Sequence, residues 1–161
     1  MNAGYMELAE RLRGEAPEIE RVTQRALAAW AQLEKMPHED AYVDSVALNL
    51  HSFYSGLERL FELIARHVDC VVPTGATWHR DLLQRMAQDL VDVRPALISK
   101  DNAVELDEFR RFRNLVRNMY TMDLTPDRIA GLISKLPDLW RRLRPELLVF
   151  ADFLQELGQA G

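Results

Sequence analysis

The sequence predicts an all-α fold, an antiparallel up-and-down bundle of about five helices. Leu, Ala, Glu and Arg, which favour helices, are abundant among the 161 residues. Apolar residues recur at helical spacing, and no strand-like alternation persists beyond a few residues. The seven glycines and seven prolines stand mostly between the periodic segments. We therefore expect short loops and a single domain over residues 1–161.

The first two helices are predicted over residues 16–35 and 39–69. Pro17 suits the first turn of the first helix, because proline lacks only an amide that has no partner there. Residues 1–15 are expected to form a loosely packed N-terminal extension. The apolar stripe of the second helix contains Val43, Val46, Leu50, Phe53, Leu57, Leu60, Phe61 and Ile64.

A third and a fourth helix follow a loop with proline and glycine at residues 71–75. Thr77 is a candidate cap for the third helix, which is predicted to reach about Val91. Residues 93–100 contain a proline and are predicted to connect the two helices. The fourth helix is predicted to run from about residue 101 to residue 122.

The last unit begins at Thr125 and Pro126, a cap followed by a proline suited to the first helical turn. Pro137 is predicted to start a new helix, and Pro145 to kink or restart it, because proline disrupts the interior of a helix. The apolar residues 149–157 are expected to dock on the core.

Composition narrows the possible partners and the compartment. The net charge is −5, so any contact with RNA must use a local basic patch. The single cysteine, Cys70, favours a reducing compartment. We predict neither a signal peptide nor a membrane-spanning segment, and expect a cytoplasmic protein.

Two further groups of side chains are assigned structural roles. Glu58 and Glu62 lie one helical turn apart with arginines nearby, so we expect a solvated face held by ion pairs. No cofactor and no metal site is expected, because the residues that could ligate zinc are too far apart and flank a loop: His67, Cys70 and His79.

The fourth helix has the most informative pattern. Arg110, Arg113 and Arg117 follow the spacing i, i+3, i+7 and therefore share one stripe, together with Asn114 and Asn118. The opposite face is predicted to be apolar and contains Phe109, Phe112, Leu115, Val116 and Met119.

Three arginines in one stripe repel one another unless an anion lies nearby. One interpretation is a set of ion pairs with carboxylates of the same or a neighbouring helix, and spacing alone favours it. The other is a site for phosphate, whose oxygens fit the planar guanidinium fork. In that case Arg110, Asn114 and Arg117 would bind the phosphates of RNA.

A resemblance supports the second interpretation. The segment R-N-L-V-R-N-M-Y (113–120), called here the signature segment, resembles the R-N-x-x-x-H-x-Y signature of HEPN-domain proteins of the HepT type. Three more segments resemble that family in the same order, and the four together cover most of the chain from about residue 43. They are N-L-H-S-F-Y-S-G-L-E-R-L-F-E-L-I-A (49–65), V-P-T-G-A-T-W-H-R-D-L-L (72–83) and F-A-D-F-L-Q-E-L (150–157).

The resemblance implies a metal-independent ribonuclease that is the toxin of a toxin–antitoxin pair. It implies a homodimer in which two signature helices face a shared cleft, with Arg113 acting at the scissile phosphate. It also implies a nucleotidyltransferase antitoxin that transfers AMP from ATP to Tyr120 and so blocks the cleft.

Asn118 stands where the family has histidine, and this departure leaves the chemistry open. Asparagine neither accepts nor returns a proton near neutral pH. His51 on the second helix could serve as the base, or Arg117 and Asn118 could bind and orient RNA for a different chemistry. The protein could instead be a non-catalytic module that binds a nucleotide or the transferase, or a helical adaptor without nucleotide chemistry.

Overall fold

The computed structural model describes residues 2–118 and 124–160, with residues 117 and 118 described by their backbone alone. Within these ranges the chain forms helices and no strand, which confirms the all-α class. None of the described helices is long and apolar enough to cross a membrane. The helical elements are α1 (Ala3–Lys35), α2 (Asp40–Ile64), the π-helical turn η1 (Ala65–Asp69), α3 (Trp78–Met86), α4 (Lys100–Asn118) and α5 (Pro126–Ala160).

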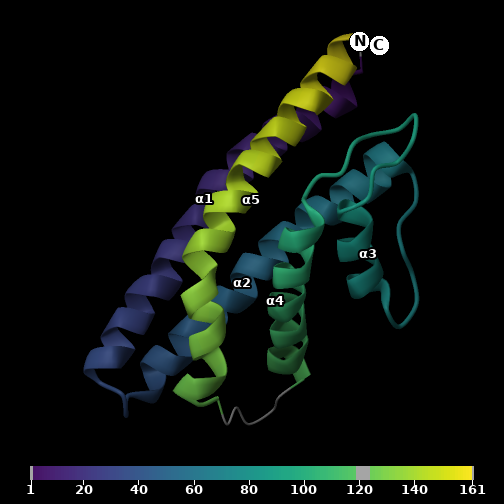
Figure 1. The fold of residues 1–161 in the computed structure, drawn as a ribbon. Coiled ribbons are helices and arrows are strands. Elements are labelled where there is room, and N and C mark those ends of the chain that lie inside the picture. The colour runs from purple at the N-terminus through teal and green to yellow at the C-terminus, as the bar shows by residue number, and fades with distance from the viewer. Residues whose placement is uncertain (1, 119–123, 161) are drawn as a thin grey trace.

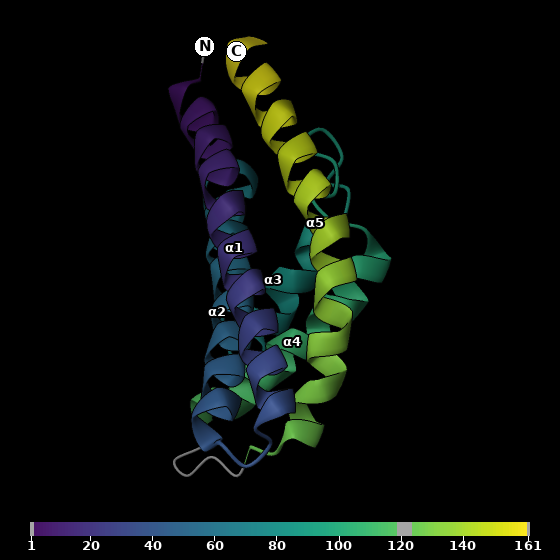
Figure 2. The ribbon, with the colours of Figure 1, turned by 90° about the vertical axis from the view of Figure 1, so that its left-hand side faces the viewer.

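Three long helices, α1, α2 and α5, form the body of the bundle (Figures 1 and 2). α1 runs antiparallel to α2 and to α5, so both ends of the chain meet at one end of the bundle, where the amide of Asn2 donates to the carbonyl of Gly158 at 2.6 Å. α3 packs against α2 and α4, and α4 also packs against α5. The face of α2 that meets α3 and α4 is therefore enclosed by two shorter helices.

The N-terminal segment is a correction to the sequence prediction. α1 begins at Ala3, with the side chain of Asn2 accepting from the amide of Gly4 at 3.0 Å as an N-cap. Leu8 and Leu12 are buried, so residues 3–15 are a packed part of the helix and not a loose extension. Pro17 consequently lies inside α1 and not in its first turn.

The prolines of the last helix also behave differently from the prediction. α5 is continuous from Pro126 to Ala160 and contains both Pro137 and Pro145 in its interior. Both prolines are exposed, so water can reach the carbonyls that lose their amide partners. Between and around them, buried Leu136, Leu139 and Leu143 keep the helix on the core.

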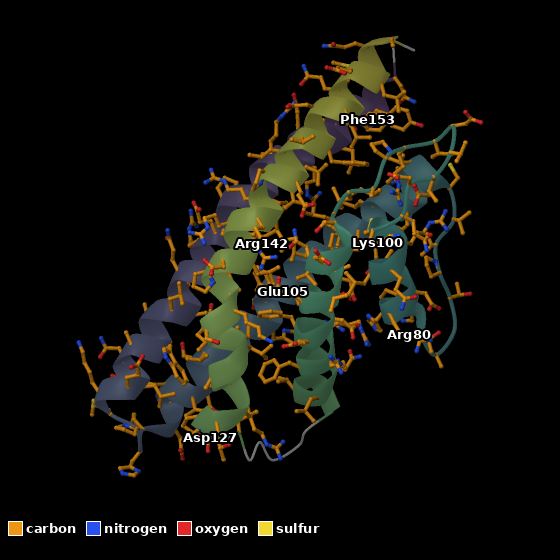
Figure 3. All side chains as sticks on the ribbon, in the orientation of Figure 1. Arg80, Lys100, Glu105, Asp127, Arg142 and Phe153 are labelled. Carbon is orange, nitrogen blue, oxygen red and sulfur yellow. The ribbon has the colours of Figure 1, made fainter. Side chains whose placement is uncertain are left out.

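The start of α4 is fixed by polar contacts with α5. The hydroxyl of Ser99 accepts from the amide of Asn102 at 3.1 Å, and the amide of Ser99 donates to Glu146 of α5 at 2.8 Å. The Glu146 carboxylate also interacts favourably with the positive end of the α4 dipole. Arg142 of α5 forms an ion pair with Glu105 of α4, and Figure 3 labels both residues.

A group of aromatic rings lies in the core where α2, α4 and α5 meet. The rings of Phe53 and Phe109 lie 5.3 Å apart, and those of Phe53 and Trp140 lie 6.3 Å apart. Phe112 is buried as predicted for the apolar face of the fourth helix, but Leu115 is 40% exposed. The core side of α4 is therefore narrower near its C-terminal end than the sequence pattern indicated.

A buried ion pair holds the segment between α3 and α4 against the end of η1. Arg94 Nε donates to Asp69 Oδ1 at 2.6 Å, Arg94 Nη2 donates to Asp69 Oδ2 at 2.9 Å, and both side chains are fully buried. The Arg94 guanidinium also donates to the carbonyls of Arg85, Gln88 and Pro95. α3 ends at Met86, earlier than predicted, because the chain turns back to let Arg94 reach Asp69.

Candidate functional site

The arginine at the start of the signature segment points into the protein. Arg113 Nε donates to Ser55 Oγ of α2 at 3.0 Å, and Arg113 Nη2 lies 3.7 Å from Glu58 Oε1. The side chain of Arg113 is only 13% exposed. At this position the structure therefore agrees with the first interpretation, an ion pair with a carboxylate of a neighbouring helix.

The same carboxylate also holds a histidine. Glu58 Oε2 lies 2.8 Å from Nδ1 of His79 in α3, and the Glu58 side chain is only 4% exposed. The prediction is thus wrong in placing Glu58 on a solvated face, although Glu58 does form ion pairs. One buried carboxylate bridges a guanidinium of α4 and an imidazole of α3, and these groups with Tyr54 and Ser55 are called here the polar cluster.

Helical spacing explains why these polar side chains are buried. On α2, Glu58 is the i+4 neighbour of Tyr54 and lies three residues before Phe61, and both aromatic rings are fully buried. On α3, His79 precedes Leu82 and Leu83 by three and four residues, and both leucines are buried. Both signals were present in the sequence, so they could have identified Glu58 and His79 as interior residues.

Two polar atoms of the cluster are buried without a hydrogen-bond partner among the described residues, Tyr54 Oη and Arg113 Nη1. Leaving such a group unsatisfied costs about 1–3 kcal/mol. Burial, and next the negative charge of Glu58, raise the pKa of Tyr54 well above its ordinary value, so its phenol stays protonated. Within the described part of the chain, the cluster therefore contains a hydroxyl and an N–H that are shielded from solvent and have no hydrogen-bond partner.

The remaining predicted site residues are spread around the cluster. Arg110 is only 13% exposed and its Nε donates to Asp107 Oδ1 at 2.6 Å, so Arg110 is also paired with a carboxylate. His51 on α2 and Asn114 on α4 are partly buried. Asn118 and Arg117 occupy the last turn of α4, and Tyr120 lies outside the described residues.

A groove lies between α3 and α4. Its volume is about 420 Å³, and its walls include Leu83, one helical turn from His79, and Arg111, next to Arg110. Lys100 and Arg111 add positive charge, while Asp107 adds a carboxylate. Among the described residues, no group of three or more histidine, cysteine, aspartate or glutamate side chains could hold a metal ion.

The described part of the signature segment, residues 113–118, lies on α4 of this helical bundle, the arrangement expected of a HEPN-type domain. The family described as HepT-like protein matches residues 45–154, from α2 into α5, and the chain belongs to this HepT-like family. Comparison with curated proteins and with solved structures gave no match.

Proposed function

We propose that the protein is the toxin of a HEPN toxin–antitoxin pair and cuts RNA without a metal ion. The observation that carries this proposal is the family match over residues 45–154, which contains the whole described part of the signature segment. The position of Arg113 supports it, because Ser55 and Glu58 hold the guanidinium in one orientation and the side chain keeps 13% of its surface exposed. A guanidinium fixed in this way is suited to bind a phosphate oxygen at its exposed edge.

We propose that the protein acts as a homodimer. The net charge is −5, and two arginines of the predicted stripe are already matched by Glu58 and Asp107. The described part of the stripe in one chain therefore presents little free positive charge to an RNA backbone, and a cleft shared by two copies would double it. Light scattering at micromolar concentration tests this, and a monomer would contradict the shared cleft.

We further propose that a nucleotidyltransferase antitoxin neutralises the protein in the cytoplasm. The tyrosine oxygen of Tyr120 would attack the α-phosphate of ATP, release pyrophosphate and keep the AMP. Incubation with the product of the neighbouring gene and ATP should add one or more AMP units to the intact mass. Tyr120→Phe should abolish the addition, whereas Tyr42→Phe, on α2, should not.

Expression in bacteria tests the toxin function. Wild-type protein should arrest growth and cut total cellular RNA in the presence of a chelator. Arg113→Lys keeps a positive charge next to Glu58 but loses the planar fork, so it should fold and lose most of the cleavage. Arg21→Lys, at a residue whose side chain is 61% exposed on α1, is the matched control and should act as wild type.

A second candidate function is a non-catalytic module that binds the nucleotidyltransferase or a nucleotide. The asparagine at residue 118, where the family signature has histidine, favours it. This candidate predicts harmless expression together with a stable complex with the transferase. Growth arrest that depends on Arg113 would exclude it.

A further inference from the structure

We propose that His79, oriented by Glu58, is the proton-transfer residue that serves in place of the missing signature histidine. This inference rests on the proposed ribonuclease function. It concerns a residue outside the signature segment, on a different helix, and it answers the question that Asn118 raises. The structure connects His79 to the signature arginine through the two oxygens of one buried carboxylate.

The hydrogen bond to Glu58 selects one form of the imidazole. A carboxylate 2.8 Å from Nδ1 requires a proton on Nδ1, which leaves the lone pair of neutral His79 on Nε2. When Nε2 takes a proton, the resulting imidazolium remains paired with Glu58. This is the arrangement by which a buried carboxylate orients a histidine base and stabilises its charged form.

The surroundings of His79 suit a substrate base. The ring stacks on Trp78 at 3.6 Å between centroids, which fixes its plane, and its side chain is 14% exposed and therefore reachable. Among the described residues, Glu58 of α2 forms an ion pair with His79, and its other oxygen faces Arg113 of α4. Leu83, one helical turn after His79, lines the groove between α3 and α4.

The proposed cleavage step needs no reactant other than the RNA and the side chains of the polar cluster. His79 Nε2 takes the proton of the ribose 2′-OH, the 2′ oxygen forms a bond to phosphorus, and the bond from phosphorus to the 5′ oxygen breaks. Arg113 donates to the phosphate oxygen on which charge grows. The imidazolium returns its proton to the 5′ oxygen, so that the products are a 2′,3′-cyclic phosphate and a 5′-hydroxyl.

The experiment compares three single histidine variants of the full chain in the chelator-treated RNA assay. In His79→Asn the side-chain amide can still donate to Glu58, so the fold is preserved while the base is removed. We expect a loss of about 100-fold or more, the range for removal of a general base. His67→Asn, at an exposed histidine of η1, is the control and should cut as wild type.

A second readout separates catalysis from structure. His79→Asn should unfold at the same urea concentration as the wild type while its RNA cleavage is lost, because the side-chain amide keeps a hydrogen bond to Glu58. Wild-type rates in His79→Asn, or a loss found only in His51→Asn, would overturn the role of His79 and leave the ribonuclease function intact. A folded wild-type protein that cuts no RNA would overturn both.

Discussion

Glu58 and His79, 21 residues apart in the sequence, lie 2.8 Å apart between α2 and α3. The other oxygen of Glu58 faces Arg113 of α4. Three helices therefore meet at one carboxylate, and both the stability of the bundle and the proposed chemistry depend on it.

Removing that carboxylate should destabilise the protein. Glu58→Ala leaves the guanidinium of Arg113 largely buried without its counter-charge, a change that costs about 3–5 kcal/mol when an ion pair is buried. Urea unfolding measures the difference. Glu18→Ala, at a carboxylate 56% exposed on α1, should change stability by about 0.5 kcal/mol or less. Equal effects of the two substitutions would contradict the bridging role of Glu58.

The buried phenol of Tyr54 predicts a dependence on alkaline pH. A tyrosine in the unfolded chain ionises near pH 10, whereas burial and the charge of Glu58 keep Tyr54 protonated in the folded protein. The folded state therefore binds the extra proton, and stability falls as pH rises above about 10, by up to about 1.4 kcal/mol per pH unit. Tyr54→Phe should remove this part of the fall.

The same substitution tests whether the Tyr54 hydroxyl has a partner. Because Tyr54 Oη has none among the described residues, Tyr54→Phe at pH 8 should leave the free energy of unfolding unchanged or raise it. Urea midpoints at pH 8 and pH 10.5 give both results. A loss of more than about 1 kcal/mol at pH 8 would show that the hydroxyl is satisfied in solution.

Gly158 should be intolerant of any side chain. A Cβ at this residue would lie 2.8 Å from Met6 Cγ and 2.9 Å from the Asn2 carbonyl oxygen, so Gly158→Ala should force α1 and α5 apart at about 1–3 kcal/mol. Gly131→Ala is the matched control, since nothing lies within 4 Å of its Cβ and alanine favours a helix. Thermal unfolding should show a lower midpoint for the first variant and an unchanged or higher one for the second.

The ion pair of Arg94 and Asp69 should matter more than exposed pairs. Arg94→Ala removes the fully buried partner of Asp69 and leaves the partly exposed Arg85 as its remaining ion-pair partner among the described residues, so we expect a loss near the lower end of about 3–5 kcal/mol. Arg13→Ala removes an ion pair with Asp152 whose two side chains are 35% and 68% exposed, and should cost about 1 kcal/mol or less. Chemical denaturation of the two variants decides whether burial makes this difference.

Much of the fold followed from sequence because apolar spacing is a local property. The second helix and the buried Phe109 and Phe112 were predicted from periodicity alone. The errors at Pro17, Pro137 and Pro145 share a cause. A proline inside a helix removes one backbone hydrogen bond, but burial of the long apolar stripe on the opposite face stabilises the helix by more than that loss.

The candidate site was less predictable because its contacts are not local. The partner of Arg113 lies 55 residues earlier on another helix, and spacing within the fourth helix could not reveal it. A glutamate within an apolar stripe, as at Glu58, was the available signal, since an isolated carboxylate is not buried without a cation. From the sequence alone, His79 is considered only as a possible zinc ligand. Its position three and four residues before Leu82 and Leu83 also indicates that it lies in the interior.

The buried ion pair of Arg94 and Asp69 has a genetic consequence. The pair fixes the segment that follows α3, the short helix that contains His79, although neither residue takes part in the proposed reaction. If expression arrests growth, a selection for surviving colonies should yield Arg94 and Asp69 substitutions as often as changes at Arg113. The two classes would separate on a gel of cell extracts, since the first would deplete the protein and the second would leave its abundance intact.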